Sequence, residues 1–428
     1  MKTDLDRIMA EHALDALVVM GPDGLLEVNA PYRYFVGDAH VTGTLFKKPG
    51  EPTTLLHHDM ERDAARSTGL RTISSSRWPL KEIFESCPDQ TRARIELYRR
   101  ILGDLGITGR VAVTGVDDVA TALALWGGLR EAIPGLEIVA GLDGTVLDEV
   151  RITKDADELR LLETVARDTC GVVSEVHDLL AALVPKGEED RRGATSAHDT
   201  GGRCAATPRT IGNLKDFVRG RMQAAGLAAP GGFILSANAD AGVPHNTGDD
   251  SHLLREGDVV LFDFFPQGAN GYCHDVTRTW SIGAPRAEVR EVFDDVLACF
   301  EEMMGAVRPG ASTRDLQLRA CEFFESRGHP TIRQDPCGTS GYVHSLGHGI
   351  GLEVHERPHF PTFRAGRDTV LEAGMVITVE PGLYYPERAL GVRIEDTVVV
   401  TEEGARSLSA VPTSLEPAVL GRPAGARA

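Results

Sequence analysis

Five acidic or imidazole side chains in the C-terminal half of this chain stand in phrases that otherwise look like buried strands. They are Asp263, Asp275, His348, Glu380 and Glu395. Glu380 and Glu395 lie in the runs VITVEPGLYY and GVRIEDTVVV, where a core residue is expected. Four carboxylates in one poorly solvated site would repel one another, because like charges there cannot all ionise. Two divalent cations carry four balancing charges, so we expect a fold that closes around a site for two metal ions.

The length and charge of the chain limit the classes of protein to which it can belong. With 428 residues, of which 42% are apolar and 25% charged, it can bury a large core and form two domains. The formal net charge of −18 argues against nucleic acid or an anionic membrane as the main partner. It does not restrict a small substrate, because only the local field in a cleft matters there.

Cysteine usage and hydropathy indicate the compartment. The opening segment MKTDLDRIMAEH carries acidic residues and no long apolar run, so we expect no secretory signal. No uninterrupted apolar stretch reaches the roughly 18 residues that a membrane span needs. The seven cysteines are scattered without CxxC spacing, which favours a reducing compartment. We therefore expect a cytoplasmic enzyme.

Residues 1–150 are expected to form an α/β domain. Helical spacing and short apolar runs alternate along this region, at residues 5–14, 16–20, 110–114, 119–133 and 136–139. We find neither a phosphate-binding loop nor a metal-ligand cluster in its sequence. Its expected role is to shape the site or to build a dimer interface.

Residues 151–412 are expected to form a second domain of mixed helix and strand character. An amphipathic helix at 156–183 precedes a loop at 186–209 that is rich in glycine, charge and small polar residues. Further elements are predicted as helices at 214–225, 286–307 and 313–327, and as strands at 232–236, 258–265, 276–282, 376–385 and 391–401. This order indicates two similar halves around one curved sheet. Residues 413–428 form a tail with little periodicity.

Asp263 and Asp275 lie on two strand-like runs joined by the turn-forming segment 266–271. Antiparallel pairing of these runs would bring both carboxylates to one face and within reach of the same metal ions. Thr277 shares the face of Asp275 by the two-residue period of a strand, so its hydroxyl is a candidate partner of a ligand. A lone aspartate between apolar residues is often a turn or cap residue, but a second one in HDVTRT favours a paired site.

Glu380 ends an apolar run and is followed by Pro-Gly, where a strand is expected to stop. Arg393 and Glu395 are two residues apart, so both point to one face of their strand. A single Arg–Glu pair of this kind is commonly an ordinary surface ion pair. The apolar residues around it favour a buried functional face instead.

His344 and His348 lie four residues apart in the phrase HSLGHGIG. This spacing invites comparison with zinc-binding helices, but HExxH is absent and the glycines disfavour a stable helix. A glycine-rich backbone instead permits close approach to a metal cluster or a substrate. We expect His348 to be a ligand and His344 to line the pocket.

His245 in VPHNTG and His355 in EVHERP are candidates for polarising a carbonyl or relaying a proton, although a single loop histidine is commonly structural. We expect structural roles for the remaining nearby side chains, the histidines His252, His274 and His359 and the buried thiol Cys273. Oxygen ligands with one imidazole suit Mn²⁺ best, with Co²⁺, Zn²⁺ and Fe²⁺ as alternatives.

These phrases, in this order, resemble the pita-bread metallopeptidases of family M24, which include methionine aminopeptidase, Xaa-Pro aminopeptidase and Xaa-Pro dipeptidase (prolidase). The resemblance covers residues 150–405, and PYRYFVG at 31–37 resembles the extra N-terminal domain of the prolidase, aminopeptidase P and creatinase branch. It implies an α/β N-terminal domain followed by an α+β pita-bread (creatinase/aminopeptidase-like) catalytic domain. It also implies a homodimer.

The same resemblance implies a role for each matched position. Asp263 would bind one metal ion, His348 and Glu380 the other, and Asp275 and Glu395 would bridge them. Glu380 would also act as general base toward a bridging hydroxide that attacks the peptide carbonyl. The other matched residues would act near the substrate: His245 and His355 at the scissile carbonyl, Arg393 beside the bridging glutamate, and His344 in the pocket wall.

The implied activity is hydrolysis of short peptides at Xaa-Pro bonds by a dinuclear metal-dependent exopeptidase. The sequence leaves open which end of the peptide is held, and so whether the chain is an aminopeptidase, a dipeptidase or a carboxypeptidase. The same fold hosts creatinase, metal-dependent lyases, hydrolases of cyclic amidines and non-catalytic binding modules. All five ligand positions are present, which argues against creatinase and the binding modules. Departures from the family pattern at Cys273, His274 and 186–209 leave the substrate preference open.

Overall fold

The computed structural model describes residues 4–22, 29–115, 118–139, 144–183, 209–363 and 366–417. Residue contacts divide the chain into two compact units, Met1–Ile152 and Thr153–Ala428. Most of the predicted loop at 186–209 and most of the predicted tail at 413–428 lie outside the described residues. Within those residues, no helix combines the length and the apolar character needed to cross a bilayer.

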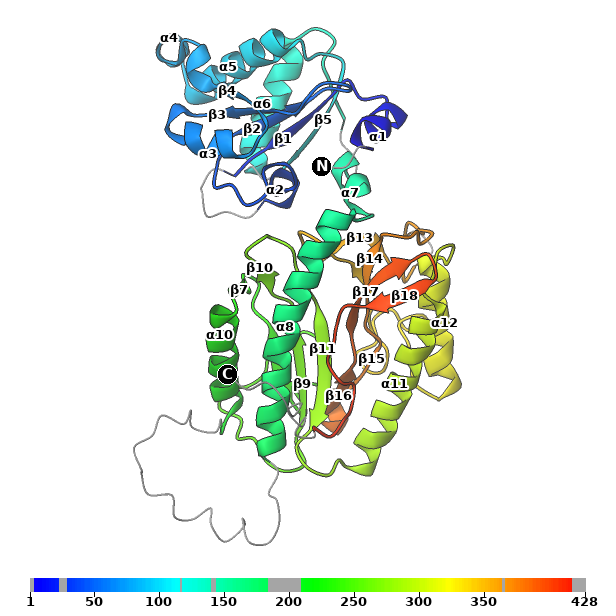
Figure 1. Ribbon diagram of the computed structural model, residues 1–428. Coiled ribbons are helices and arrows are strands. Elements are labelled where there is room, and N and C mark those ends of the chain that lie inside the picture. The colour runs from blue at the N-terminus through cyan, green and yellow to red at the C-terminus, as the bar shows by residue number, and fades with distance from the viewer. Residues whose placement is uncertain are drawn as a thin grey trace, which may run out of the picture. The chain divides into compact units, whose positions relative to one another are not determined.

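The first unit contains a six-stranded mixed sheet (Figure 1). Its strands, in order of pairing, are β4 (Arg71–Ser74), β3 (Thr54–His57), β2 (Thr44–Lys47), β1 (Ala16–Met20), β5 (Arg110–Gly115) and β6 (Glu137–Val139). Neighbours pair antiparallel from β1 to β3, and parallel elsewhere. The described helices are α1 (Leu5–Glu11), α2 (Ala30–Val36), α3 (Arg62–Ser67), α4 (Leu80–Ser86), α5 (Gln90–Leu105), α6 (Val119–Ala132) and α7 (Val146–Arg151).

Helices cover both faces of this sheet because successive side chains of β1 point to opposite faces. Leu17 and Val19 pack with residues of α1, α2 and α7, whereas Ala16, Val18 and Met20 pack with residues of α4, α5 and α6. All five positions of β1 are apolar and buried, as expected for a strand covered on both sides. The α/β character predicted for this region is confirmed.

The second unit is built around two larger antiparallel sheets (Figure 1). One sheet has the order β8 (Ile234–Ala237), β9 (Val259–Phe264) and β11 (Val276–Ser281). The other has the order β13 (Glu356–His359), β12 (His348–Gly349), β14 (Val376–Val379), β17 (Asp396–Thr401) and β18 (Gly404–Ser407). Two short pairs complete the strands, β7 (Leu227–Ala228) with β10 (Gln267–Gly268), and β15 (Gly382–Tyr385) with β16 (Leu390–Arg393).

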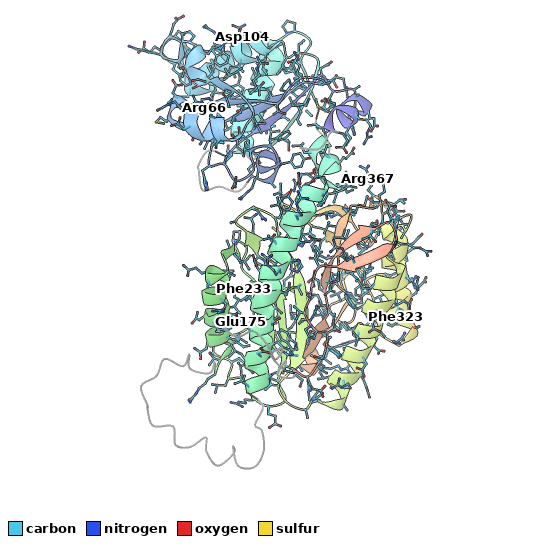
Figure 2. All side chains as sticks on the ribbon, in the orientation of Figure 1. Arg66, Asp104, Glu175, Phe233, Phe323 and Arg367 are labelled. Atoms are coloured by element: carbon cyan, nitrogen blue, oxygen red, sulfur yellow. The ribbon has the colours of Figure 1, made fainter. Side chains whose placement is uncertain are left out.

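Four long helices pack against these strands as two pairs (Figure 1). They are α8 (Ala156–Ala182) with α10 (Ile211–Ala224), and α11 (Ala287–Ala306) with α12 (Thr313–Ser326). Two residues labelled in Figure 2, Phe233 and Glu175, illustrate the packing around the first helix pair, α8 and α10. Phe233 packs edge-on against Phe262 and Phe264 of β9, and Glu175 of α8 accepts a hydrogen bond from Arg221 of α10 at 2.6 Å.

The predicted strands at 376–385 and 391–401 are each divided in the structure, which differs from the expectation of one continuous curved sheet. The first run forms β14 and β15, the second forms β16 and β17, and the two parts of each run belong to different sheets. Pro381 helps to end β14 because proline has no N–H to donate to a neighbouring strand. Glu380 and Glu395 therefore lie at junctions between strands. A bridge between Thr277 and Glu395 links the two larger sheets at that point.

Candidate metal centre

Asp263 and Asp275 are brought together by the β9–β11 pairing. Asp263 lies near the end of β9, directly opposite Thr277 of β11, and Asp275 immediately precedes β11. The Thr397 hydroxyl holds the backbone of Asp275, because it accepts from the amide at 3.1 Å and donates to the carbonyl at 2.8 Å. Both carboxylates are buried. The antiparallel pairing predicted from sequence therefore delivers two carboxylates to one site.

The two glutamates enter the site from the strand junctions. The Glu395 amide donates to the carbonyl of Thr277 at 3.1 Å, and its Oε2 accepts from the Thr277 hydroxyl at 2.6 Å. The Glu380 amide donates to the carbonyl of Leu346 at 2.8 Å, which ties this junction to the segment that leads to His348. The backbone of each glutamate is thus held by a different part of the unit.

His348 on β12 faces the carboxylates. Its Nε2 lies 3.5 Å from Oε1 of Glu380 and 3.7 Å from Oδ2 of Asp275. Ligand atoms of Asp275, His348 and Glu395 all lie within 4.8 Å of one another, which is a spacing that one ion can bridge. The charges of Asp263 and Glu380 also act on the Asp275 carboxyl, so the five residues predicted from the sequence to be ligands all border one site.

The donor set fits divalent cations. Nδ1 of His348 lies 3.0 Å from the Gly349 carbonyl, which can only accept, so Nδ1 carries the proton and Nε2 presents its lone pair to the carboxylates. The Oδ1 atoms of Asp263 and Asp275 are buried and have no hydrogen-bond partner among the described residues. Converging lone pairs without donors are what a bound cation satisfies.

Burial sets the electrostatics of the site. It raises the pKa of Glu380 to about 7, while the charge of Arg393 acts in the opposite direction. Burial, followed by the charges of neighbouring carboxylates, raises the pKa of Asp275 and of Glu395 well above their ordinary values. Burial also lowers the pKa of His348 to about 3, so this imidazole is neutral near neutral pH. The carboxylates can therefore ionise together only if positive charge is added.

Arg393 is the fixed cation of the site, and each of its three nitrogens is engaged. Nη2 binds Oδ2 of Asp263, Nε donates to the Thr277 hydroxyl at 3.0 Å, and Nη1 donates to the Tyr384 hydroxyl at 2.7 Å. Thr277 accepts from Arg393 and uses its own hydrogen for Glu395. Thr277 thus couples Arg393 to a predicted ligand.

Tyr384 is a residue of the site that the sequence analysis missed. Its hydroxyl accepts from Arg393 and lies 2.9 Å from Nε2 of His344. Nδ1 of His344 lies 2.7 Å from the Ser345 carbonyl, so Nδ1 carries the proton and Nε2 accepts from the tyrosine. Strand parity could not have identified it, because Glu380 and Tyr384 lie on either side of the junction between β14 and β15, which belong to different sheets. His344 itself lies 4.0 Å from Oε2 of Glu380.

His245 and His355 stand at exposed positions next to this buried cluster. The ring centroid of His355 is 4.3 Å from that of His348. Burial is the main cause that lowers the pKa of His344 to about 3, and the nearby charge of His245 acts in the same direction. Burial also lowers the pKa of His355, with His245 again acting in the same direction. The ring contact places His355 beside a predicted ligand, and His245 is near enough for its charge to act on both His344 and His355.

His274 and Cys273, the two residues that depart from the family pattern, are buried. Among the described residues, neither side chain forms a hydrogen bond with the side chain of a predicted ligand. His274 has Nε2 3.2 Å from the Ser409 hydroxyl and 3.9 Å from Sγ of Cys170, and burial lowers its pKa to about 3. Cys273 is a free thiol, and burial raises its pKa to about 12.

The fold and the site together define a pita-bread protein with a buried acidic metal centre. Residues 168–402, more than half of the chain, match the family model of metallopeptidase family M24. The chain belongs to this family. Among curated proteins it is 38% identical over 178 residues to an Xaa-Pro dipeptidase of Pyrococcus furiosus, a match that covers 41% of this chain and 46% of that protein. The chain spans about half the length of the curated relatives it matches.

The similarity to solved structures is a similarity of fold, and it covers both units of the chain. Dipeptidase PepE from Mycobacterium ulcerans has a TM-score of 0.71 at 25% identity and covers 96% of this chain and 95% of that chain. X-Pro aminopeptidase from Thermotoga maritima has a TM-score of 0.69 at 23% identity and covers 96% and 99%. The fold class predicted from the sequence, α/β followed by a pita-bread domain, is confirmed.

Proposed function

We propose that this chain is a metal-dependent exopeptidase that hydrolyses short peptides at Xaa-Pro bonds. The observation that carries the proposal is the approach of the Glu380 and Asp275 carboxylates to the unprotonated Nε2 of His348, with the Oδ1 atoms of Asp263 and Asp275 buried and unpaired among the described residues. The names of its relatives, Xaa-Pro dipeptidase and X-Pro aminopeptidase, support the choice of bond. A homodimer in the cytoplasm is the expected form of the enzyme.

The proposed cofactor is a pair of divalent ions. Five side chains would hold them: Asp263, Asp275, His348, Glu380 and Glu395. The oxygen-rich set with one imidazole favours Mn²⁺, with Co²⁺, Zn²⁺ and Fe²⁺ as alternatives. When bound, such ions lower the pKa of a water molecule and withdraw electron density from a peptide carbonyl.

Glu380 is the proposed general base. It would take a proton from the water that attacks the carbonyl carbon. It would then deliver that proton to the proline nitrogen as the carbon–nitrogen bond breaks, leaving a carboxylate and a secondary amine. Thr378 donates to Oε1 of Glu380 at 3.4 Å, which leaves Oε2 for this transfer.

His245 and His355 are the proposed donors to the carbonyl oxygen. Both lie at exposed positions beside the buried ligands, where the carbonyl of an entering peptide can reach them. His344 would border the substrate pocket while Tyr384 holds its ring. Arg393 would orient Asp263 directly and Glu395 through Thr277.

An activity panel tests the proposal. Chelated protein is reconstituted with Mn²⁺, Co²⁺ or Zn²⁺ and offered Xaa-Pro dipeptides, Xaa-Pro-Yaa tripeptides and proline-free controls. Mass spectrometry identifies the products. We expect metal-dependent cleavage, and the products identify the end of the peptide that is held. Absence of cleavage with every metal would reject the peptidase and favour a small-molecule hydrolase or lyase.

A further inference from the structure

A buried ion pair lies beside the proposed active site but outside the ligand set. Nζ of Lys154 is 3.2 Å from Oε2 of Glu356, and the two side chains are only 1% and 5% exposed. The backbone amide of Lys154 donates to the Gly374 carbonyl at 2.7 Å, which holds the lysine in place before α8 begins. Removing two charges from water is costly, so a pair buried this completely calls for a reason beyond stability.

Glu356 shapes the turn that carries His355. Its Oε1 accepts a hydrogen bond from the Glu353 amide at 3.0 Å and so closes the turn on which His355 is the last residue. The same carboxylate lies against Gly351, where an added Cβ would be 2.6 Å from Oε2. The His355 ring, next in sequence to Glu356, is 4.3 Å from the ring of His348. The direction of His355 therefore depends on where the Glu356 carboxylate is held.

The same turn is tied to the segment of a predicted ligand. The Gly351 carbonyl accepts from the Cys273 amide at 2.7 Å, and Cys273 is two residues before Asp275. Lys154 lies at the other end of this arrangement, 202 residues from Glu356 in the chain. Lys154 thus anchors the Glu356 carboxylate, and this carboxylate orders the turn that lies between His355 and the segment of Asp275.

We propose that Lys154 and Glu356 are positioning residues that hold His355 at the carbonyl of the bound peptide. The inference rests on the proposed function. Lys154 holds the Glu356 carboxylate directed into the turn, and Glu356 in turn accepts from the Glu353 amide and packs against Gly351. The effect of the pair on catalysis passes through His355. It should therefore disappear when His355 is absent.

The test is a double-mutant cycle between the ion pair and His355. Lys154→Met is made in the wild-type and His355→Ala backgrounds, and kcat and KM are measured on an Xaa-Pro dipeptide with the best metal. In the wild-type background we expect kcat to fall by about tenfold or more with KM within about twofold, because small displacements of a positioned group are costly. In the His355→Ala background we expect less than about a twofold further loss. Lys47→Met, at a buried lysine of the first unit, is the matched control and should leave kcat unchanged.

Hydrogen exchange provides a readout that does not need activity. Lys154→Met should raise deuterium uptake in the peptide that contains the Glu353 amide, while α11 and α12 keep their wild-type protection. If Lys154→Met does not fold, because it leaves one charge buried, Lys154→Met/Glu356→Gln removes both charges and carries the same two measurements.

Two outcomes overturn the inference. An unchanged kcat shows that the pair does not position a reacting group, and equal losses with and without His355 show a general structural effect. A wild-type protein that cleaves no peptide with any metal rejects the proposed function instead. In that case unchanged deuterium uptake at Glu353 in Lys154→Met also rejects the ordering of the turn by the ion pair. Raised uptake supports that ordering.

Discussion

Nε2 of His348 lies 3.5 Å from Oε1 of Glu380, and neither atom carries a hydrogen when the glutamate is ionised. The imidazole proton is on the opposite nitrogen, directed at the Gly349 carbonyl. When Glu380 is ionised, the two facing lone pairs repel each other in the ion-free protein and attract a cation placed between them. The stability, pH response and activity of the protein should all reflect this relationship.

Removal of divalent ions should lower the thermal stability. The buried carboxylates then repel one another or must take up protons, whereas bound ions stabilise the folded state by about 2.7 kcal/mol at 100 times their Kd. For a unit of this size we expect the Tm to fall by about 5 °C or more after chelation, and to recover on adding Mn²⁺. Differential scanning fluorimetry measures the shift. An unchanged Tm after complete chelation, verified by elemental analysis, would count against a buried metal centre.

Glu380→Gln should remove most of the hydrolytic activity. The amide cannot take a proton from water, and losing a general base typically costs about 10²–10⁴-fold in rate. We expect kcat on the preferred Xaa-Pro peptide to fall by at least about 10²-fold while the far-ultraviolet circular dichroism is unchanged. Glu372→Gln, the same change at an exposed glutamate just before β14, is the control and should be silent. Near-wild-type turnover in Glu380→Gln would remove Glu380 as the base.

The pH dependence of ion-free stability should carry the signature of Glu380. Burial raises its pKa from 4.5 to about 7, so the folded state binds this proton more tightly than the unfolded state does. The resulting stabilisation is fully present below pH 4.5 and is lost as the pH rises through about 7. We expect ion-free Glu380→Gln to become progressively more stable than ion-free wild type over that interval. Urea titrations at each pH measure the difference, which includes the titration of Asp275 and Glu395 in the same direction, because the Glu380 charge raises the pKa of both. A difference that does not vary with pH would be inconsistent with a raised pKa.

Tyr384→Phe should impair catalysis although it changes a single oxygen. The hydroxyl joins Nη1 of Arg393 to Nε2 of His344, and its loss leaves buried polar groups without a partner. Such a loss costs about 1–3 kcal/mol of folding stability, and we expect kcat/KM to fall by about tenfold because Arg393 and His344 lose the group that holds them in place. Tyr385→Phe is a matched control in the next residue, because its hydroxyl binds His329 at 2.6 Å instead. Equal effects of the two changes would show that Tyr384 acts through strand stability alone.

Much of the secondary structure could be predicted because it depends on local periodicity. The helices expected at 286–307 and 313–327 are present as α11 and α12, with their ends within one residue of the predicted ones. The boundaries of strands were harder. The runs 376–385 and 391–401 were each predicted as one continuous strand. In the structure each run passes from one sheet to another, at Glu380 and at Glu395 respectively. No local pattern specifies which distant strand a segment will pair with.

The sequence by itself predicted which side chains would hold ions, because a lone carboxylate in an apolar run has a large desolvation cost unless it has a charged partner. It also determined the family, through five such residues in order. Only the tertiary structure decided how the site is held together. Thr277 joins Arg393 to Glu395, and Tyr384 joins Arg393 to His344. Lys154 forms an ion pair with Glu356. These contacts join segments far apart in the chain. They exist only because the folded sheets bring donors and acceptors within about 3 Å, a distance that no local sequence pattern encodes.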